Sequence, residues 1–233
     1  MMRQIYLLLA ALTAASVSAN DSVGVDFELT ADAAACTPAL SNNGVADFGT
    51  RNAGSLATNS FTQLGTRDLT LTITCESSTA LAITSRDTRS SSVRAGEDDN
   101  RGFGPYFSAN GGLNVVYASR LFGLGMTAEN KRIGSYAIRI NADNITAMDG
   151  SQSVNVDMAG SESKTAGWSR LEHYLLPATE DYFYTFVKKG TVAPQAVSSV
   201  SVPLQISVSL ADKLGSSQKI TLDGEAVISL VYL

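Results

Sequence analysis

The chain ends on GEAVISLVYL, residues 224–233, and this stretch decides how the fold is interpreted. Apolar side chains alternate along it, and the same phase continues backwards through Leu222 and Ile220. A period of two indicates a strand with one face to be buried. We expect one long strand across 219–233, in which Gly224 permits a kink. Chain termini usually fray, so this regular strand predicts that something covers its apolar face.

The other end of the chain predicts export. Residues 1–20 read MMRQIYLLLAALTAASVSAN, with Arg3 at the start, an apolar core and a small-residue site at Val17-Ser18-Ala19. This is the pattern of a secretory signal peptide, and its apolar core is too short for a membrane span. We therefore expect cleavage after residue 19 and no transmembrane segment. The remaining chain is long enough for one large domain with a sizeable core.

Composition narrows the function classes. The chain has 17 Lys and Arg against 22 Asp and Glu, a formal net charge of −5, which argues against nucleic acid as a partner. Its two cysteines are Cys36 and Cys75, and an even count in an exported chain predicts a disulfide. Such a bridge closes a loop of about 40 residues and would stabilise the fold by about 4 kcal/mol in the chain-entropy model. No third ligand and no CxxC motif accompany the pair, so we expect no metal and no cofactor.

Strand signals recur along the chain and predict an all-β antiparallel sandwich. Ser and Thr alternate with apolar residues, so only one side of each sheet would be buried. Pro203 predicts an edge or a bulge in the last of these strands. Two regions break the pattern: 85–112, which is charged and Gly-rich and predicts a long loop, and 161–190. The alternating stretches are 22–31, 68–75, 135–141, 153–158 and 199–210.

An enzyme is not expected. His173 is the single histidine, and no nucleophile motif accompanies it. A monomeric secreted sandwich that binds a carbohydrate or surface ligand through Trp168 and the tyrosines near 174–184 is an alternative. An outer-membrane β-barrel fits less well, because aromatic residues are only 7% of the chain and it ends on Leu233.

The two ends of the chain suggest another function. The stretch before Cys36 alternates as cleanly as the last strand, and such an exposed strand is an aggregation hazard unless it pairs. Adding it to the open sheet edge of another subunit is β-augmentation. The alternating apolar residues of this stretch are Val23, Val25, Phe27, Leu29 and Ala31.

In these features the chain resembles chaperone–usher pilins and, more narrowly, the fimbrial-protein-like family DUF1120. The resemblance covers most of the chain after the signal peptide. It rests on FELTADAAACTPALSNNGVADFGT (27–50), LGTRDLTLTITC (64–75), LFGLGMTAENKRIGSYAIRI (121–140) and KITLDGEAVISLVYL (219–233).

The resemblance implies an immunoglobulin-like, pilin-type sandwich with long insertions, spanning residues 36–233 after an N-terminal extension at 20–35. Pilins lack their final strand, which leaves an apolar groove beside the C-terminal strand. A periplasmic chaperone fills that groove first, and the N-terminal donor strand of a neighbouring subunit replaces it at the outer-membrane usher. The donor strand here would be Val23 to Ala31. The groove-edge and chaperone-recognition strand would carry Leu222, Gly224, Ala226, Ile228, Leu230 and Tyr232.

By the same resemblance, Cys36 and Cys75 would join the first two strands. The implied function is a structural fimbrial subunit that contributes to adhesion and passes through the periplasm to the cell surface. One position departs from the pilin pattern. Pilin donor strands usually carry a glycine seven residues before the first cysteine, and this chain has Leu29 there.

Overall fold

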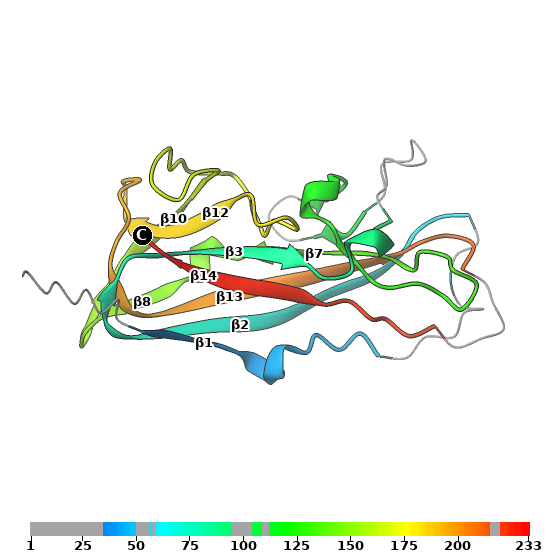
Figure 1. Ribbon diagram of the computed structural model, residues 1–233, viewed down its shortest axis with the longest axis horizontal. Helices are drawn as coiled ribbons and strands as arrows, with labels where there is room; N and C mark the ends of the chain where they lie inside the picture. The colour runs from blue at the N-terminus through cyan, green and yellow to red at the C-terminus, as the bar shows by residue number, and fades with distance from the viewer. Residues whose placement is uncertain (1–34, 50–55, 57–58, 95–103, 109–111, 215–219) are drawn as a thin grey trace, which may run out of the picture. The chain divides into compact units, whose positions relative to one another are not determined.

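The computed structural model describes residues 35–49, 56, 59–94, 104–108, 112–214 and 220–233. All of them belong to one compact unit, Ala33–Leu233. The candidate donor strand at 23–31 and the predicted signal peptide at 1–19 lie outside the described residues. Across the described ranges, regular structure consists of β-strands and short 3-10 turns, so the predicted all-β fold is confirmed (Figure 1). None of these segments is a helix long and apolar enough to cross a membrane.

The larger sheet is built around two long strands. β2 (Thr62–Thr79) and β13 (Val197–Leu210) pair antiparallel along most of their length. Apolar residues of β2 alternate with threonines, and the apolar set points inward, as the sequence predicts. The sheet order is β1-β2-β13-β7-β11, with β6 added to β7, β8 to β13, and β9 to β8. The remaining strands of this sheet are β1 (Cys36–Leu40), β6 (Phe122–Gly123), β7 (Gly134–Ile140), β8 (Thr146–Asp149), β9 (Gln152–Val154) and β11 (Tyr174–Leu175).

The smaller sheet has four antiparallel strands in the order β10-β12-β3-β14. They are β10 (Val156–Ser161), β12 (Phe183–Lys188), β3 (Leu81–Asp87) and β14 (Ala226–Tyr232). The stretch 153–158, predicted as one strand, is therefore two. It changes sheets at Asn155, with β9 in the larger sheet and β10 in the smaller one.

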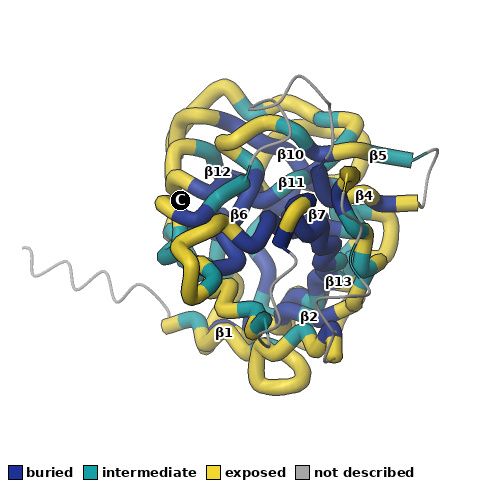
Figure 2. Tube along the Cα trace, turned by 90° about the vertical axis from the view of Figure 1, so that its right-hand side faces the viewer, coloured by how far each residue is buried: buried dark blue, intermediate teal, exposed yellow. Residues whose placement is uncertain are grey.

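The main core lies between the two sheets. Dark, fully buried segments occupy the centre in Figure 2, and exposed segments surround them. One continuous cluster joins inward side chains of both sheets. Its fully buried members include Leu71, Ile73, Ile83, Met158, Tyr184 and Phe186. Two alternating sheets facing each other across one core make the sandwich that the sequence predicts.

Pro203 does not mark an edge or a bulge, contrary to the expectation. It lies in the middle of β13, between β2 and the strands on the other side. Its carbonyl accepts a hydrogen bond from Asn141 N (2.9 Å), so its missing N–H also falls on that side. There β13 changes partner, from β8 at Ser201 to β7 at Leu204. The proline therefore occupies a gap in the ladder and interrupts no pairing.

The described part of the predicted long loop 85–112 is partly ordered. It contains β4 (Tyr106–Phe107), which pairs with β5 (Leu113–Asn114) directly after the loop. It covers the outer face of the larger sheet, where Ser207 Oγ donates to Tyr106 O (2.8 Å). A second small hydrophobic cluster lies under it, made of Phe107, Val115, Leu121 and Ala137.

The last strand is shorter than predicted. β14 begins at Ala226, so Leu222 and Gly224 lie before it and not in a single strand from 219. Asp223 N donates to Leu124 O (3.0 Å), outside the smaller sheet, which explains why the ladder with β3 starts only later. β14 is nevertheless an edge strand of the smaller sheet.

Candidate functional site

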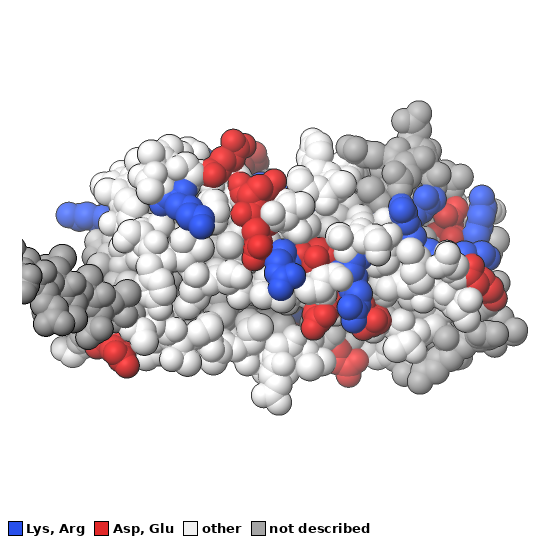
Figure 3. Space-filling model, in the orientation of Figure 1, with Lys and Arg blue, Asp and Glu red and all other residues white. Residues whose placement is uncertain are grey.

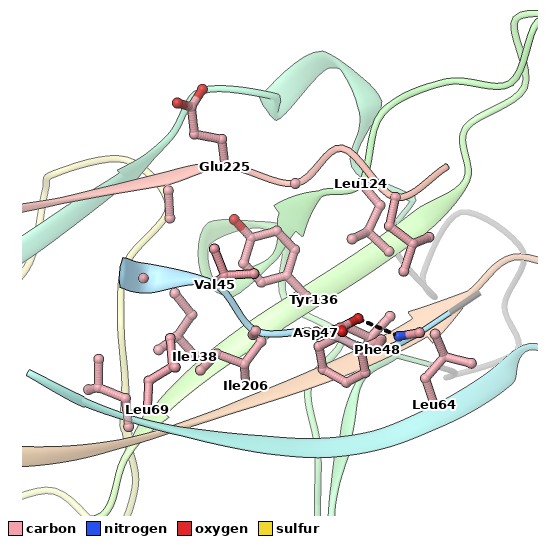
Figure 4. Close-up of a pocket in the computed structure, with 18 of the residues that line it drawn as sticks. Val45, Asp47, Phe48, Leu64, Leu69, Leu124, Tyr136, Ile138, Ile206 and Glu225 are labelled. Atoms are coloured by element: carbon pink, nitrogen blue, oxygen red, sulfur yellow. Dashed lines mark hydrogen bonds between the residues drawn. The ribbon is translucent and has the colours of Figure 1, made fainter. Parts of the chain in front are cut away.

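An apolar groove of about 700 Å³ opens beside β14. Its floor is made of inward side chains of β2, β7 and β13, among them Leu69, Ile138 and Ile206 (Figure 4). Two segments form its walls: residues 43–49, which follow β1, and residues 220–228, which lead into and begin β14. The groove therefore lies where the edges of the two sheets diverge.

The wall on the β14 side has an unpaired backbone edge. Thr88 N donates to Glu225 O (3.2 Å), and Leu233 N donates to Ala80 O (3.1 Å). Odd-numbered residues of β14 thus form the hydrogen-bonded pairs with β3, and even-numbered residues point their N–H and C=O groups away from it. Among the strands that the structure describes, none pairs with this free edge. The side chains of the same even-numbered residues pack toward the core: Ala226, Ile228 and Leu230.

The opposite wall is an extended segment without a strand ladder. We call residues 45–49 the strap. It follows three consecutive left-handed residues, Asn42, Asn43 and Gly44, at φ 51°, 51° and 77°, a conformation that Asn and Gly tolerate best. Within the described residues the strap belongs to no sheet.

Side chains hold the strap in place. Phe48 is buried and lies under the guanidinium of Arg67, 5.0 Å from the ring centre. Arg67 Nε also donates to Asp47 O (2.7 Å), and Gly49 N donates to Asp47 Oδ1 (2.7 Å). In contrast, Val45 is 61% exposed. The strap is thus fixed at its Phe48 end, and Val45 stands open to solvent.

One end of the groove is closed by the two terminal strands. Cys36 N donates to the hydroxyl of Tyr232 (3.0 Å), which joins the start of β1 to the end of β14. The disulfide Cys36–Cys75 holds this end of β1 on β2. The groove lining begins beyond this contact, at Leu40 and Ile228. One side-chain hydrogen bond therefore links the two edges at Tyr232, and the groove extends from Ile228 toward Ile220.

Tyr136 lies at the middle of the groove. It projects from β7, with its hydroxyl toward the segment that carries Glu225, and its ring stacks on Phe122 with centroids 5.1 Å apart (Figure 4). Gly224 makes room for it, because a Cβ there would lie 2.7 Å from Tyr136 Cε1. Burial, with smaller effects of Asp87 and Glu225, raises the pKa of Tyr136. Its hydroxyl therefore stays protonated at neutral pH.

The outer rim beside the groove carries paired charges. Arg89 contacts Asp223 (Nε–Oδ2, 3.2 Å) and Glu225 (Nη1–Oε2, 3.7 Å). Acidic and basic side chains are interspersed near the middle of the face in Figure 3, and large areas of that face carry no charge. Exposed pairs of this kind contribute little stability. The groove lining itself is mainly apolar, so its chemistry suits an apolar strand and not a charged ligand.

A second pocket, of about 220 Å³, is small and polar. His173 lies in it, with Nε2 3.8 Å from Glu172 Oε1. Trp168 lines neither this pocket nor the groove, and Tyr174 uses its hydroxyl to donate to Met158 O (2.6 Å). The stacking surface expected for a carbohydrate-binding protein is therefore not assembled at either pocket. Across the described ranges, no group of three or more His, Cys, Asp or Glu side chains is arranged to hold a metal ion.

Comparison with known proteins identifies the family. The model of DUF1120, a protein family of unknown function, matches residues 27–137. The chain is also 47% identical to "Uncharacterized protein YhcF" of Escherichia coli strain K12, over 238 residues that cover 100% of both chains. The chain belongs to the DUF1120 family. "Protein GltF" of the same strain is 31% identical over 248 residues, covering 96% of this chain and 95% of GltF. No solved structure matches the chain.

In this DUF1120 protein, only some of the residues predicted for the groove edge line the groove. Leu222, Gly224, Ala226 and Ile228 line the groove. Leu230 packs against the core, and Tyr232 is 44% exposed at the closed end. The predicted donor residues, Val23, Val25, Phe27, Leu29 and Ala31, lie outside the described residues.

Sequence reasoning missed two parts of the groove. The strap was not predicted, although Ala46 and Phe48 continue the even-numbered phase of Leu40 and were a usable signal. Tyr136 was predicted as a strand residue only. No local pattern reveals that its ring reaches the distant Gly224, since that contact depends on the pairing of whole strands.

Proposed function

We propose that this chain is an exported structural subunit of a surface fimbria, assembled by donor-strand exchange with a periplasmic chaperone and an outer-membrane usher. The observation that carries the proposal is the groove of about 700 Å³ beside the free edge of β14. An added strand would form backbone hydrogen bonds with that edge and place alternate apolar side chains in the groove. Burying five such side chains would contribute on the order of 10 kcal/mol before ordering costs.

Two further features support the same function. An open edge with an apolar face invites uncontrolled pairing, so a chain that presents one needs a partner that covers it. The sequence supplies an alternating segment of suitable type at 23–31. A chaperone would cover the groove during export, and a neighbouring subunit would cover it in the fibre.

A matched pair of substitutions in β14 tests the proposal. Ile228→Ser places a hydroxyl in the groove, whereas Val227→Ser changes the adjacent residue, which does not line it. With chaperone and usher co-produced, we expect Ile228→Ser to reduce chaperone co-purification and surface fibres at least roughly tenfold, the effect of about 1.4 kcal/mol. Val227→Ser should leave both near the wild-type level. Equal effects of the two changes, or a wild-type chain that remains a stable monomer, would contradict the proposal.

A further inference from the structure

We propose that Arg120 and Tyr117 form a binding site for a carboxylated sugar residue, such as a hexuronic acid. Neither residue lines the groove or the second pocket. The site therefore does not depend on the donor-strand function proposed above. It would give an exported subunit a direct contact with an acidic surface polysaccharide.

The first observation is a guanidinium group without a polar partner. Among the described residues, the Arg120 side chain makes no hydrogen bond and no ion pair, and its Nη1 is fully buried. Burying a charged donor without a partner costs stability, so folding alone does not explain why an arginine occupies this position. Several other arginines of the chain have carboxylate, amide or carbonyl partners: Arg67, Arg86, Arg89, Arg139 and Arg170.

The other two nitrogens of Arg120 form a fork that suits a carboxylate. Nε and Nη2 also have no partner among the described residues, but they are not fully buried, so solvent reaches them. At Arg89 the same two nitrogens donate to the carboxylate of Asp223, from Nε to Oδ2 (3.2 Å) and from Nη2 to Oδ1 (3.3 Å). A planar guanidinium binds carboxylates in this two-point manner. Arg120 therefore offers to an external ligand the arrangement that Arg89 uses within the fold.

The fold fixes the orientation of this fork. Arg120 Cζ lies 4.8 Å from the centre of the Tyr182 ring, which is a cation–π contact. The backbone on either side is held as well, because Leu121 is fully buried and Ala178 N donates to Ser119 O (2.9 Å). A guanidinium that is already oriented loses little conformational entropy when a ligand binds.

An exposed aromatic ring lies one turn away from the fork. Tyr117 is 65% exposed, the highest value among the large hydrophobic residues that the structure describes. Arg120 N donates to Tyr117 O (2.9 Å), and this bond closes a 3-10 turn with a rise of about 6 Å. In a hexuronic acid the carboxylate is bonded directly to the pyranose ring, which has an apolar C–H face. With the carboxylate on Arg120, this face would lie on the Tyr117 ring.

The charge around the fork favours a ligand with a single negative charge. Burial raises the pKa of Tyr182, Arg120 lowers it, and Glu162 raises it, so Arg120 and Glu162 act on the same hydroxyl with opposite sign. A phosphate group carries about −1.5 to −2 charges at neutral pH and would be repelled more strongly by Glu162 than a carboxylate. The ligand group expected at Arg120 is therefore a carboxylate.

Calorimetric titration of the exported full-length chain with glucuronate, and with glucose as the neutral analogue, tests the site. We expect Arg120→Gln and Tyr117→Ala each to weaken glucuronate binding roughly tenfold, the effect of about 1.4 kcal/mol. Arg120→Lys keeps the charge but loses the fork, so it should also weaken binding. Arg170→Gln is the matched control, because this exposed arginine already pairs with Asp157, and it should bind as wild type does.

The other outcomes each contradict a defined part of the inference. Equal binding of glucose and glucuronate would overturn the recognition of a carboxylate by Arg120. Displacement of glucuronate by an equal concentration of a glutamate-rich peptide would overturn a sugar as the ligand. Absence of glucuronate binding, or binding that Tyr117→Ala leaves unchanged, would overturn the site, and this variant changes an exposed ring that the folded core does not use. None of these results bears on donor-strand exchange.

Discussion

At the scale of single residues, Gly224 and Tyr136 shape the groove as a pair. A Cβ at position 224 would lie 2.7 Å from the Tyr136 ring and 3.2 Å from Gly123 O. We expect Gly224→Ala to lower the free energy of unfolding by about 1–3 kcal/mol, the usual cost of overpacking. In a Tyr136→Leu background the same substitution should cost much less, because the ring is gone. Denaturant titration of the four chains measures this coupling, and equal costs in both backgrounds would show that the ring does not restrict position 224.

Asp87 is a second residue whose role follows from its contacts. It is buried, and its two carboxylate oxygens accept from Arg89 N and Gly123 N, both at 2.8 Å. Asn offers only one acceptor oxygen, so Asp87→Asn should cost about 1–3 kcal/mol of stability. Asp181→Asn, at an exposed position between β11 and β12, is a control for loss of charge alone. A neutral effect of Asp87→Asn would show that these two bonds do not hold Arg89 and the end of β6 in place.

The same residue predicts a pH dependence. Burial raises the pKa of Asp87 above its ordinary value of 3.8, although the two backbone hydrogen bonds and Arg89 oppose this. The folded chain therefore binds this proton more tightly than the unfolded chain, and the contribution of Asp87 to stability falls as pH rises from below 3.8. The wild type should therefore lose part of its stability advantage over Asp87→Asn as the pH rises from below 3.8. Unfolding titrations at a series of pH values measure it, and a difference that grows with pH would contradict the assignment.

At the scale of elements, the disulfide fixes β1 where the groove closes. Cys36 and Cys75 are directly paired residues of β1 and β2 and lie 39 residues apart in the sequence. Replacing both by Ser should lower the free energy of unfolding by about 4 kcal/mol. It should also loosen the Tyr232 contact, because Cys36 N is its donor. Urea unfolding and chaperone co-purification measure the two effects, and an unchanged midpoint would show that pairing with β2 alone holds β1.

Several elements could be predicted from the sequence because their signals are local. Alternation identified the strands now seen as β2, β7, β13 and β14, and two lone cysteines sufficed for the disulfide. The predicted strand boundaries and edge positions were wrong where tertiary contacts determine them. β14 starts late because Asp223 bonds to Leu124, and Pro203 fits a central strand because β13 changes neighbours beside it. The strap escaped prediction for the same reason, since its position depends on Phe48 packing under Arg67.

At the scale of the whole molecule, the hydrophobic core has two parts, and only one of them lines the groove. The main cluster lies between the sheets and forms the floor of the groove. The smaller cluster lies on the outer face of β7, under β4 and β5, and contributes no residue to the groove. Arg139 links that cluster to the larger sheet, since its guanidinium lies 5.2 Å from the centre of the Phe107 ring and donates to Gln205. The described residues of 104–121 are therefore packed on the sandwich independently of the free edge of β14.

This separation predicts that the packing of residues 104–121 on the sandwich can be weakened without loss of fibre assembly. Phe107 is 1% exposed, and Phe107→Ala should cost about 3 kcal/mol, at the low end for a buried phenylalanine because the cluster is small. Hydrogen exchange should rise in residues 104–121, while fibre yield stays near wild type. Phe48→Ala is the matched comparison, because it removes the same ring from the strap and should lower fibre yield. If Phe107→Ala abolishes fibres while the sandwich stays folded, the insertion must itself contact the neighbouring subunit, and the groove would be only one part of the assembly interface.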